Sequence, residues 1–292
     1  MTASSGDAIG GTAVTPLPMG VTLGPIGVDA AWWLDSARRL DEAGYDAIWT
    51  WDHFVSKGRD RTTPVLEAWT LLSAAAAVTR RAHLGTFVLN VMNRHPAVLA
   101  RMAATLQEAS AGRLRLGIGI GGHAAEHAAY GIPFPEAAER AARLEEAIGV
   151  LRALFAGGPA TVAGRFYPLT EAHAYPRPEP APPILVGART PAGVRLAARA
   201  GDGWAAESDV FERLAPRYLE ALAVAGRDRR DQLVVVGFGA GRSGEDALRG
   251  SPWVERPEEE LARWEAAGAD EVTVTARTNA DVDTLVEAAS RR

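Results

Sequence analysis

The sequence contains no cysteine and only one lysine, Lys57. Without cysteine there can be no disulfide framework, no thiolate nucleophile and no cysteine-bound metal. Because nothing in this composition marks an oxidising compartment, we expect a cytoplasmic protein.

Positive charge and long apolar runs are also scarce. The net charge at pH 7 is −5, whereas nucleic-acid-binding proteins turn clustered Lys and Arg toward phosphates. Residues 1–18 contain neither a basic leader nor an apolar run long enough for a signal peptide or a membrane span. We therefore expect no nucleic-acid or membrane partner, a disordered tail over residues 1–18, and a single domain over residues 19–292.

What the sequence does contain is a regular alternation of short β-branched runs and longer stretches of helical period. Such alternation is typical of parallel strands that are buried on both faces and joined by crossover helices. The pattern predicts strands at residues 20–23, 47–50, 82–89, 114–120, 184–186, 203–206, 233–237 and 271–274. It predicts helices at residues 32–43, 65–78, 97–109, 137–155, 192–200, 211–225, 257–267 and 282–289. Eight such repeats favour an α/β fold of the (β/α)₈ barrel type over an open doubly wound sheet.

One connection in this pattern is unusually long. Residues 156–183 contain two short strand candidates and a proline-rich end. Proline cannot donate to a sheet ladder, and long insertions lie at the surface. We therefore expect a hairpin insertion before the fifth barrel strand.

Polar residues at strand ends are the first candidates for chemistry, because the active sites of such barrels lie at the C-terminal rim. The second strand ends in Trp51-Asp52-His53, which offers an acceptor and a side chain that titrates near neutrality. Asp52 could equally cap a turn, and His53 could be a histidine without catalytic work. Asn90, at the end of the third strand, could contact a ligand or satisfy local backbone groups.

The fourth strand ends in a glycine run that includes Gly119, Gly121 and Gly122. Missing side chains there would let the backbone approach a flat or phosphorylated ligand, and a flexible surface loop is the alternative. The run is not a dinucleotide-binding fingerprint. Just beyond it, His123-Ala-Ala-Glu126-His127 matches the HxxEH zinc-peptidase pattern, which makes a zinc peptidase a remote alternative.

The fifth strand runs through Gly187 and Ala188 to Arg189-Thr190-Pro191 and directly into a helix. Free backbone N–H groups beside a guanidinium would hold a phosphate. In the plainer interpretation, Thr190 is a helix cap and Arg189 a solvated side chain.

Taken in order, these segments resemble the luciferase-like oxidoreductases, and in particular the branch that uses coenzyme F420, a deazaflavin. The matching pieces are residues 44–54 (GYDAIWTWDHF), 84–89 (LGTFVL), 94–96 (RHP), 112–119 (GRLRLGIG), 126–134 (EHAAYGIPF), 183–187 (PILVG) and 198–204 (ARAGDGW). Each piece is degenerate alone, but the shared order and spacing cover nearly everything from Gly20 onward.

The resemblance implies that the cofactor ring lies across the barrel mouth above a strand bulge with a non-proline cis peptide, which by position is Phe87-Val88. It also implies that Asp52, His53, Val88 and Asn90 contact cofactor or substrate. The glycines from Gly119 to Gly122 would flank the cofactor tail, and the segment from Gly187 to Thr190 would take its phosphate.

The sequence departs from the sugar-phosphate-oxidising branch of this family. That branch carries a Trp soon after the His and a Glu after the glycine run, where this chain has Lys57 and Gly122. We therefore expect a different substrate, and with that Glu absent His53 is the remaining acid or base candidate.

The function implied by the resemblance is hydride transfer between F420 and a small organic substrate. His53 would bind the substrate or exchange a proton with it while the cofactor carries the hydride. The alternatives are a two-component FMN-dependent monooxygenase and an inactive flavin-binding relative. A homodimer is typical of the family.

Overall fold

The computed structural model describes residues 16–56, 60–239 and 247–291. Lys57 and most of the expected N-terminal tail lie outside these ranges.

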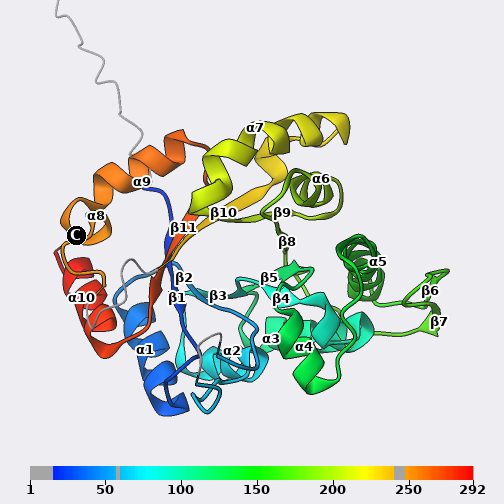
Figure 1. Cartoon of the computed structure of the whole chain (residues 1–292), viewed down its shortest axis with the longest axis horizontal. Coiled ribbons are helices and arrows are strands. Elements are labelled where there is room, and N and C mark those ends of the chain that lie inside the picture. Colours follow the sequence, from blue (N-terminus) through cyan, green and yellow to red (C-terminus); the bar gives the residue numbers. More distant parts are fainter. Residues whose placement is uncertain (1–15, 57–59, 240–246, 292) are drawn as a thin grey trace, which may run out of the picture.

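Eight parallel strand positions close into a barrel (Figure 1). The strands run in the order β3-β2-β1-β11-β10-β9-β8-β5, and pairing of β3 with β5 closes the ring. Their bounds are β1 Met19–Leu23, β2 Ala47–Thr50, β3 His83–Thr86, β5 Leu114–Gly119, β8 Ile184–Gly187, β9 Gly203–Glu207, β10 Leu233–Phe238 and β11 Glu271–Ala276. The short β4, Leu89–Asn90, continues the line of β3 and also pairs with β5. The (β/α)₈ barrel expected from the sequence is confirmed.

Helices surround the barrel, and Figure 1 shows them as an outer ring. Eight follow the expected pattern: α1 Ala30–Glu42, α2 Ala68–Val78, α3 Pro96–Ala109, α5 Ala137–Phe155, α6 Pro191–Ala200, α7 Ser208–Val224, α9 Pro257–Ala266 and α10 Asn279–Ala289. The sequence pattern missed the short helices α4 (Ala124–Tyr130) and α8 (Pro252–Glu255) and the 3₁₀ turns η1 (Val91–Asn93) and η2 (Arg229–Asp231). Within the described ranges, no helix combines the length and apolar character needed to cross a bilayer.

Between α5 and β8 the chain leaves the barrel as a small antiparallel pair. Strands β6 (Ala160–Val162) and β7 (Leu169–Ala172) pair with each other and with no barrel strand. Figure 1 shows them projecting at the edge of the molecule, beside α5.

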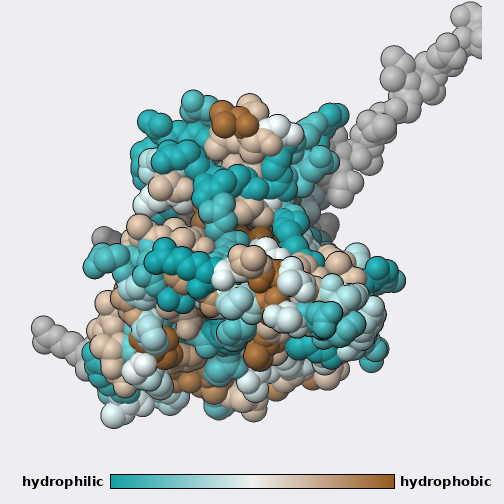
Figure 2. All heavy atoms as spheres, turned by 90° about the vertical axis from the view of Figure 1, so that its right-hand side faces the viewer, coloured by the Kyte–Doolittle hydropathy of each residue, from teal (hydrophilic) through white to brown (hydrophobic). Residues whose placement is uncertain are grey.

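Apolar side chains form two layers, and polar side chains cover much of the face shown in Figure 2. The larger layer lies between the strands and the helices. The smaller layer fills the barrel interior around Trp49, whose indole N–H donates to Glu271 Oε1 at 2.7 Å. A Cβ on Gly85 would lie 2.3 Å from the Trp49 ring, so glycine at that position makes room for this large side chain. Arg115 forms an ion pair with the same buried Glu271.

Candidate active site at the barrel mouth

The C-terminal ends of the strands border a cavity of about 860 Å³. Its lining includes every site residue expected from the sequence: Asp52, His53, Phe87, Val88, Asn90, Gly119, Gly121, Gly122, Gly187, Ala188, Arg189 and Thr190. Four segments that are far apart in the chain therefore meet at one place. A second cavity of about 500 Å³ shares Trp51, His53, Phe87 and Glu207 with the first.

The bulge between β3 and β4 contains a cis peptide at Phe87-Val88, as the family resemblance implied. The Val88 side chain packs against Gly119 and Gly187, where an added Cβ would lie 2.9 and 2.7 Å from Val88 Cγ2. These two glycines therefore make room for the bulge itself. At Gly122, by contrast, an added Cβ would meet no atom within 4 Å, so the space beside this residue is open.

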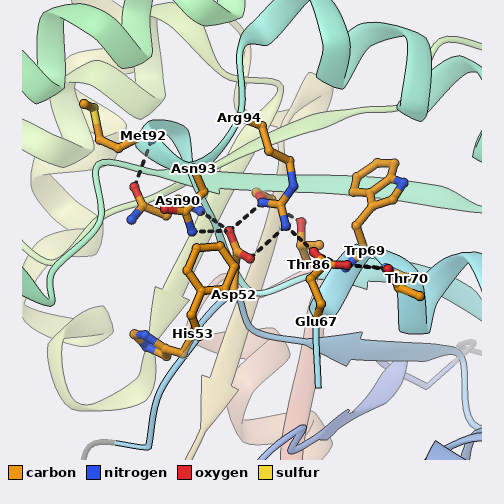
Figure 3. A network of polar contacts seen from close by, with 12 residues as sticks. Asp52, His53, Glu67, Trp69, Thr70, Thr86, Asn90, Met92, Asn93 and Arg94 are labelled. Carbon is orange, nitrogen blue, oxygen red and sulfur yellow. Dashed lines mark hydrogen bonds and ion pairs between the residues drawn. The ribbon is translucent and has the colours of Figure 1, made fainter. Parts of the chain in front are cut away.

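Asp52 holds the ends of two neighbouring strands together (Figure 3). Its Oδ2 accepts hydrogen bonds from the Asn90 backbone N–H (3.0 Å), Asn93 Nδ2 (3.0 Å) and Arg94 Nη1 (2.7 Å), and its Oδ1 accepts from Arg94 Nη2 (3.1 Å). Arg94 also pairs with Glu67. Burial disfavours the charge on Arg94, but the two carboxylates outweigh it and raise the pKa of Arg94 above its ordinary value. Both carboxylate oxygens of Asp52 therefore accept hydrogen bonds from the protein itself, although the residue lines the cavity.

Asn90 behaves largely as a turn residue. Its Oδ1 accepts from the Met92 backbone N–H at 3.0 Å and caps η1, while its Nδ2 donates to His127 Nε2 at 2.6 Å. Burial favours the neutral imidazole and lowers the pKa of His127. The hydrogen bond to Met92 is the local backbone contact that the sequence suggested as the alternative to ligand binding. Asn90 also lies on the cavity wall.

His53 has two titratable neighbours that the sequence argument did not place beside it. Its Nδ1 donates to Glu126 Oε2 at 3.3 Å, and His123 Nδ1 lies 3.6 Å from the same oxygen. In Figure 3 the His53 ring points away from the Asp52–Arg94 network. The sequence argument named only His53 as an acid or base here, whereas the structure places Glu126 and His123 beside it. Glu126 lies on α4, a helix that the periodicity did not reveal. The available signals were its presence in the HxxEH match and at the start of the family-like segment 126–134.

Glu126 is held in its charged form. Its side chain is only 2% exposed, and burial alone would raise its pKa. The backbone N–H groups of Phe54 (2.9 Å) and Val55 (3.2 Å) and the nearby His53 outweigh burial, and the pKa of Glu126 falls below its ordinary value.

The zinc-peptidase arrangement is not formed. His123 precedes α4 as its N-cap, whereas His127 lies within the helix, contacts Asn90, and packs 4.4 Å from the Phe134 ring. The two imidazoles do not converge one helical turn apart on the same open site, as that chemistry requires.

The end of β8 also shows the helix cap expected in the plainer interpretation. Thr190 Oγ1 accepts from the Gly193 backbone N–H at 3.1 Å and caps α6. Arg189 pairs with Glu207 and with Asp209 (2.7 Å), and these carboxylates raise its pKa. Such exposed pairs contribute little free energy, so a bound anion could compete for the guanidinium.

Comparison with known proteins gives the family. Residues 13–247 match the luciferase-like monooxygenase family. The chain belongs to that family. An F420-dependent glucose-6-phosphate dehydrogenase from Kineococcus radiotolerans is 40% identical over 200 residues, which is 66% of this chain and 58% of that protein. The chain thus matches less than two thirds of this relative's length.

Solved structures of other proteins share the fold. An F420-dependent secondary alcohol dehydrogenase in complex with an F420–acetone adduct has a TM-score of 0.80 and 21% identity, over 94% of this chain and 98% of that one. The coenzyme F420-dependent tetrahydromethanopterin reductase from Methanopyrus kandleri has a TM-score of 0.74 and 18% identity, with the same coverage. At these identities the likeness supports the architecture.

Proposed function

We propose that this luciferase-like protein is an oxidoreductase that transfers a hydride between coenzyme F420 and a small organic substrate. The observation that carries the proposal is the larger cavity at the barrel mouth, of about 860 Å³, which gathers every residue expected to contact this cofactor. The names of the relatives support deazaflavin over FMN.

The residues present fit a flat ring with a phosphorylated tail. The Phe87-Val88 bulge, Leu89 and Ala205 offer an apolar surface on one part of the cavity wall. The open space beside Gly122 leaves room for a ligand, as the unfilled Cβ position shows. Arg189 and the start of α6 would receive a phosphate, with Glu207 and Asp209 giving up their exposed ion pairs.

The smaller cavity is the proposed substrate site. When bound, the deazaflavin supplies or accepts the hydride, and the protein positions the substrate. His53 lines both cavities, where it would hold a polar group of the substrate by a hydrogen bond. Trp51 and Phe87 line both cavities as well and would exclude water from the reacting carbon. A volume of about 500 Å³ suits a small molecule.

We propose that the substrate is not a sugar phosphate, although relatives carry the name of a glucose-6-phosphate dehydrogenase. The sugar-phosphate branch has a Glu after the glycine run, and this chain has Gly122 with empty space beside it. We expect no reduction of F420 with glucose 6-phosphate. Turnover with that sugar phosphate would overturn this part of the proposal.

Titration of F420 fluorescence tests cofactor choice. We expect quenching that saturates at micromolar F420, with much weaker binding of FMN. Micromolar binding of FMN with none of F420 would instead indicate the monooxygenase alternative.

Gly122→Leu would place a side chain in the open part of the cavity and should weaken F420 binding at least about tenfold, or 1.4 kcal/mol. Gly149→Leu is the matched control, because Gly149 is exposed on α5 with no atom near its Cβ position.

We also propose a cytoplasmic homodimer, as in the sequence-based expectation. Light scattering behind size-exclusion chromatography measures the assembly directly. A mass near twice 30.9 kDa is the expected result, and a monomer would refute it.

A further inference from the structure

Three side chains at the rim of the larger cavity bring metal-binding atoms together. His53, His123 and Glu126 each offer one donor atom, and these atoms all lie within 4.8 Å of one another. The two imidazole Nδ1 atoms lie 3.3 and 3.6 Å from Glu126 Oε2. Donor atoms that share a tetrahedral zinc ion with bonds of about 2.0–2.1 Å lie roughly 3.3–3.4 Å apart. The separations of both imidazole nitrogens from Glu126 Oε2 are therefore close to those of ligands around one ion.

Backbone donors hold the carboxylate in place. Glu126 Oε2 accepts hydrogen bonds from the backbone N–H groups of Phe54 and Val55. The same oxygen faces both imidazoles, so it cannot turn away from them without losing these two hydrogen bonds. Metal-binding carboxylates are typically fixed by such outer hydrogen bonds. The buried position also removes competing water, since the Glu126 side chain is 2% exposed.

One imidazole has a buried nitrogen without a hydrogen bond among the described residues. His123 Nδ1 is shielded from solvent, and within residues 16–56, 60–239 and 247–291 it makes no hydrogen bond. A buried polar atom without a partner is unfavourable by about 1–3 kcal/mol, and a metal ion between it and Glu126 Oε2 would satisfy it. His123 and Glu126 lie three positions apart across the start of α4, and His53 approaches from the end of β2.

We propose that His53, His123 and Glu126 bind one divalent first-row transition-metal ion, with zinc the best match for two imidazoles and a carboxylate. Three protein ligands leave at least one coordination position for water or substrate, as in catalytic zinc sites. All three residues line the larger cavity, so that position is accessible to a bound small molecule. The site differs from the HxxEH pattern, because His127 bonds to Asn90 instead.

Metal binding can be measured without any cofactor, so this inference stands or falls separately from the proposed function. The full chain is stripped with a chelator, desalted and titrated with Zn²⁺ by calorimetry and with Co²⁺ by visible absorption. We expect one equivalent of Zn²⁺ and a Co²⁺ spectrum of low coordination number. X-ray absorption at the zinc edge should show nitrogen and oxygen neighbours at about 2.0–2.1 Å.

Two variants and a control assign the ligands. His123→Ala and Glu126→Gln should each weaken Zn²⁺ binding by at least about tenfold, and the glutamine retains an oxygen for the Phe54 and Val55 N–H groups. His173→Ala removes an exposed histidine from the loop after β7 and should leave binding unchanged. No zinc uptake, or uptake that survives both site variants, would overturn the proposal. Loss of uptake in His173→Ala would show binding at surface histidines and overturn it too.

Discussion

The packing of Val88 against Gly187 predicts a non-additive effect on stability. A Cβ at position 187 would lie 2.7 Å from Val88 Cγ2 and 3.1 Å from Cγ1, closer than packed atoms tolerate. Overpacking of this kind costs about 1–3 kcal/mol. We therefore expect Gly187→Ala to lower the free energy of unfolding by about that amount.

The double variant isolates the cause. Val88→Ala removes both clashing methyl groups, and the nearest remaining Val88 side-chain atom, Cβ, would be at an ordinary 3.5 Å. The double variant should therefore be more stable than the sum of the single effects predicts, by about 1–3 kcal/mol. As a control, Gly149→Ala on the exposed face of α5 should cost nothing and should add independently to Val88→Ala.

Urea unfolding followed by circular dichroism measures these free energies. Additivity of Gly187→Ala and Val88→Ala within about 0.5 kcal/mol would refute the packing argument. It would mean that glycine is needed at position 187 for another reason, such as direct contact with a ligand.

Three further predictions concern other parts of the molecule. The Asp41 carboxylate accepts hydrogen bonds from the backbone N–H groups of Arg80, Arg81 and Ala82. Burial opposes its charge and would raise its pKa, but these hydrogen bonds outweigh burial and lower the pKa. The charged Asp41 side chain therefore stabilises the fold above about pH 4, and this stabilisation is lost at lower pH. In urea unfolding, Asp41→Asn should lower the free energy of unfolding by about 1–3 kcal/mol at pH 7 and by less at pH 3. An equal loss at both pH values would contradict this. Glu271→Gln would remove the buried carboxylate that pairs with Arg115 and should cost about 3–5 kcal/mol in the same assay; a cost below 1 kcal/mol would mean the pair is dispensable. His53→Ala should slow turnover about 10²-fold with F420 affinity little changed, and an unchanged rate would remove His53 from the reaction.

The barrel was predictable because each repeat carries its own signals. Buried β-branched runs, helical periodicity and caps such as Thr190 act locally, and eight repeats leave few alternatives. Helix starts were less accurate. The second helix was expected from residue 65 but begins at Ala68, because Glu67 accepts the Trp69 and Thr70 N–H groups and caps it.

The third strand shows why the site was only partly predictable. Phe87 and Val88 look like ordinary strand residues, and their periodicity gives no sign that a bulge separates β3 from β4. That feature came from family resemblance. The bulge depends on glycines at positions 119, 187 and 237, which lie on other strands. Because these glycines have no side chains, they leave room for the Phe87 and Val88 side chains.

Glu126 was missed for a related reason. It reaches His53 only because the barrel brings the end of β2 beside the start of α4, 73 residues later in the chain. Residue order alone places Glu126 near His123 and His127, where it suggested a peptidase motif. In the tertiary structure His127 bonds to Asn90, and His53 joins His123 beside Glu126.

Transfer of an isotopic label tests hydride transfer most directly. Reduced F420 carrying deuterium at C5 would be mixed anaerobically with a panel of small ketones, aldehydes and enones, and each product analysed by mass spectrometry and NMR. The account predicts deuterium on one carbon of a reduced product, formed without oxygen. Product formation that requires reduced FMN and oxygen, with no label transferred from F420, would contradict it.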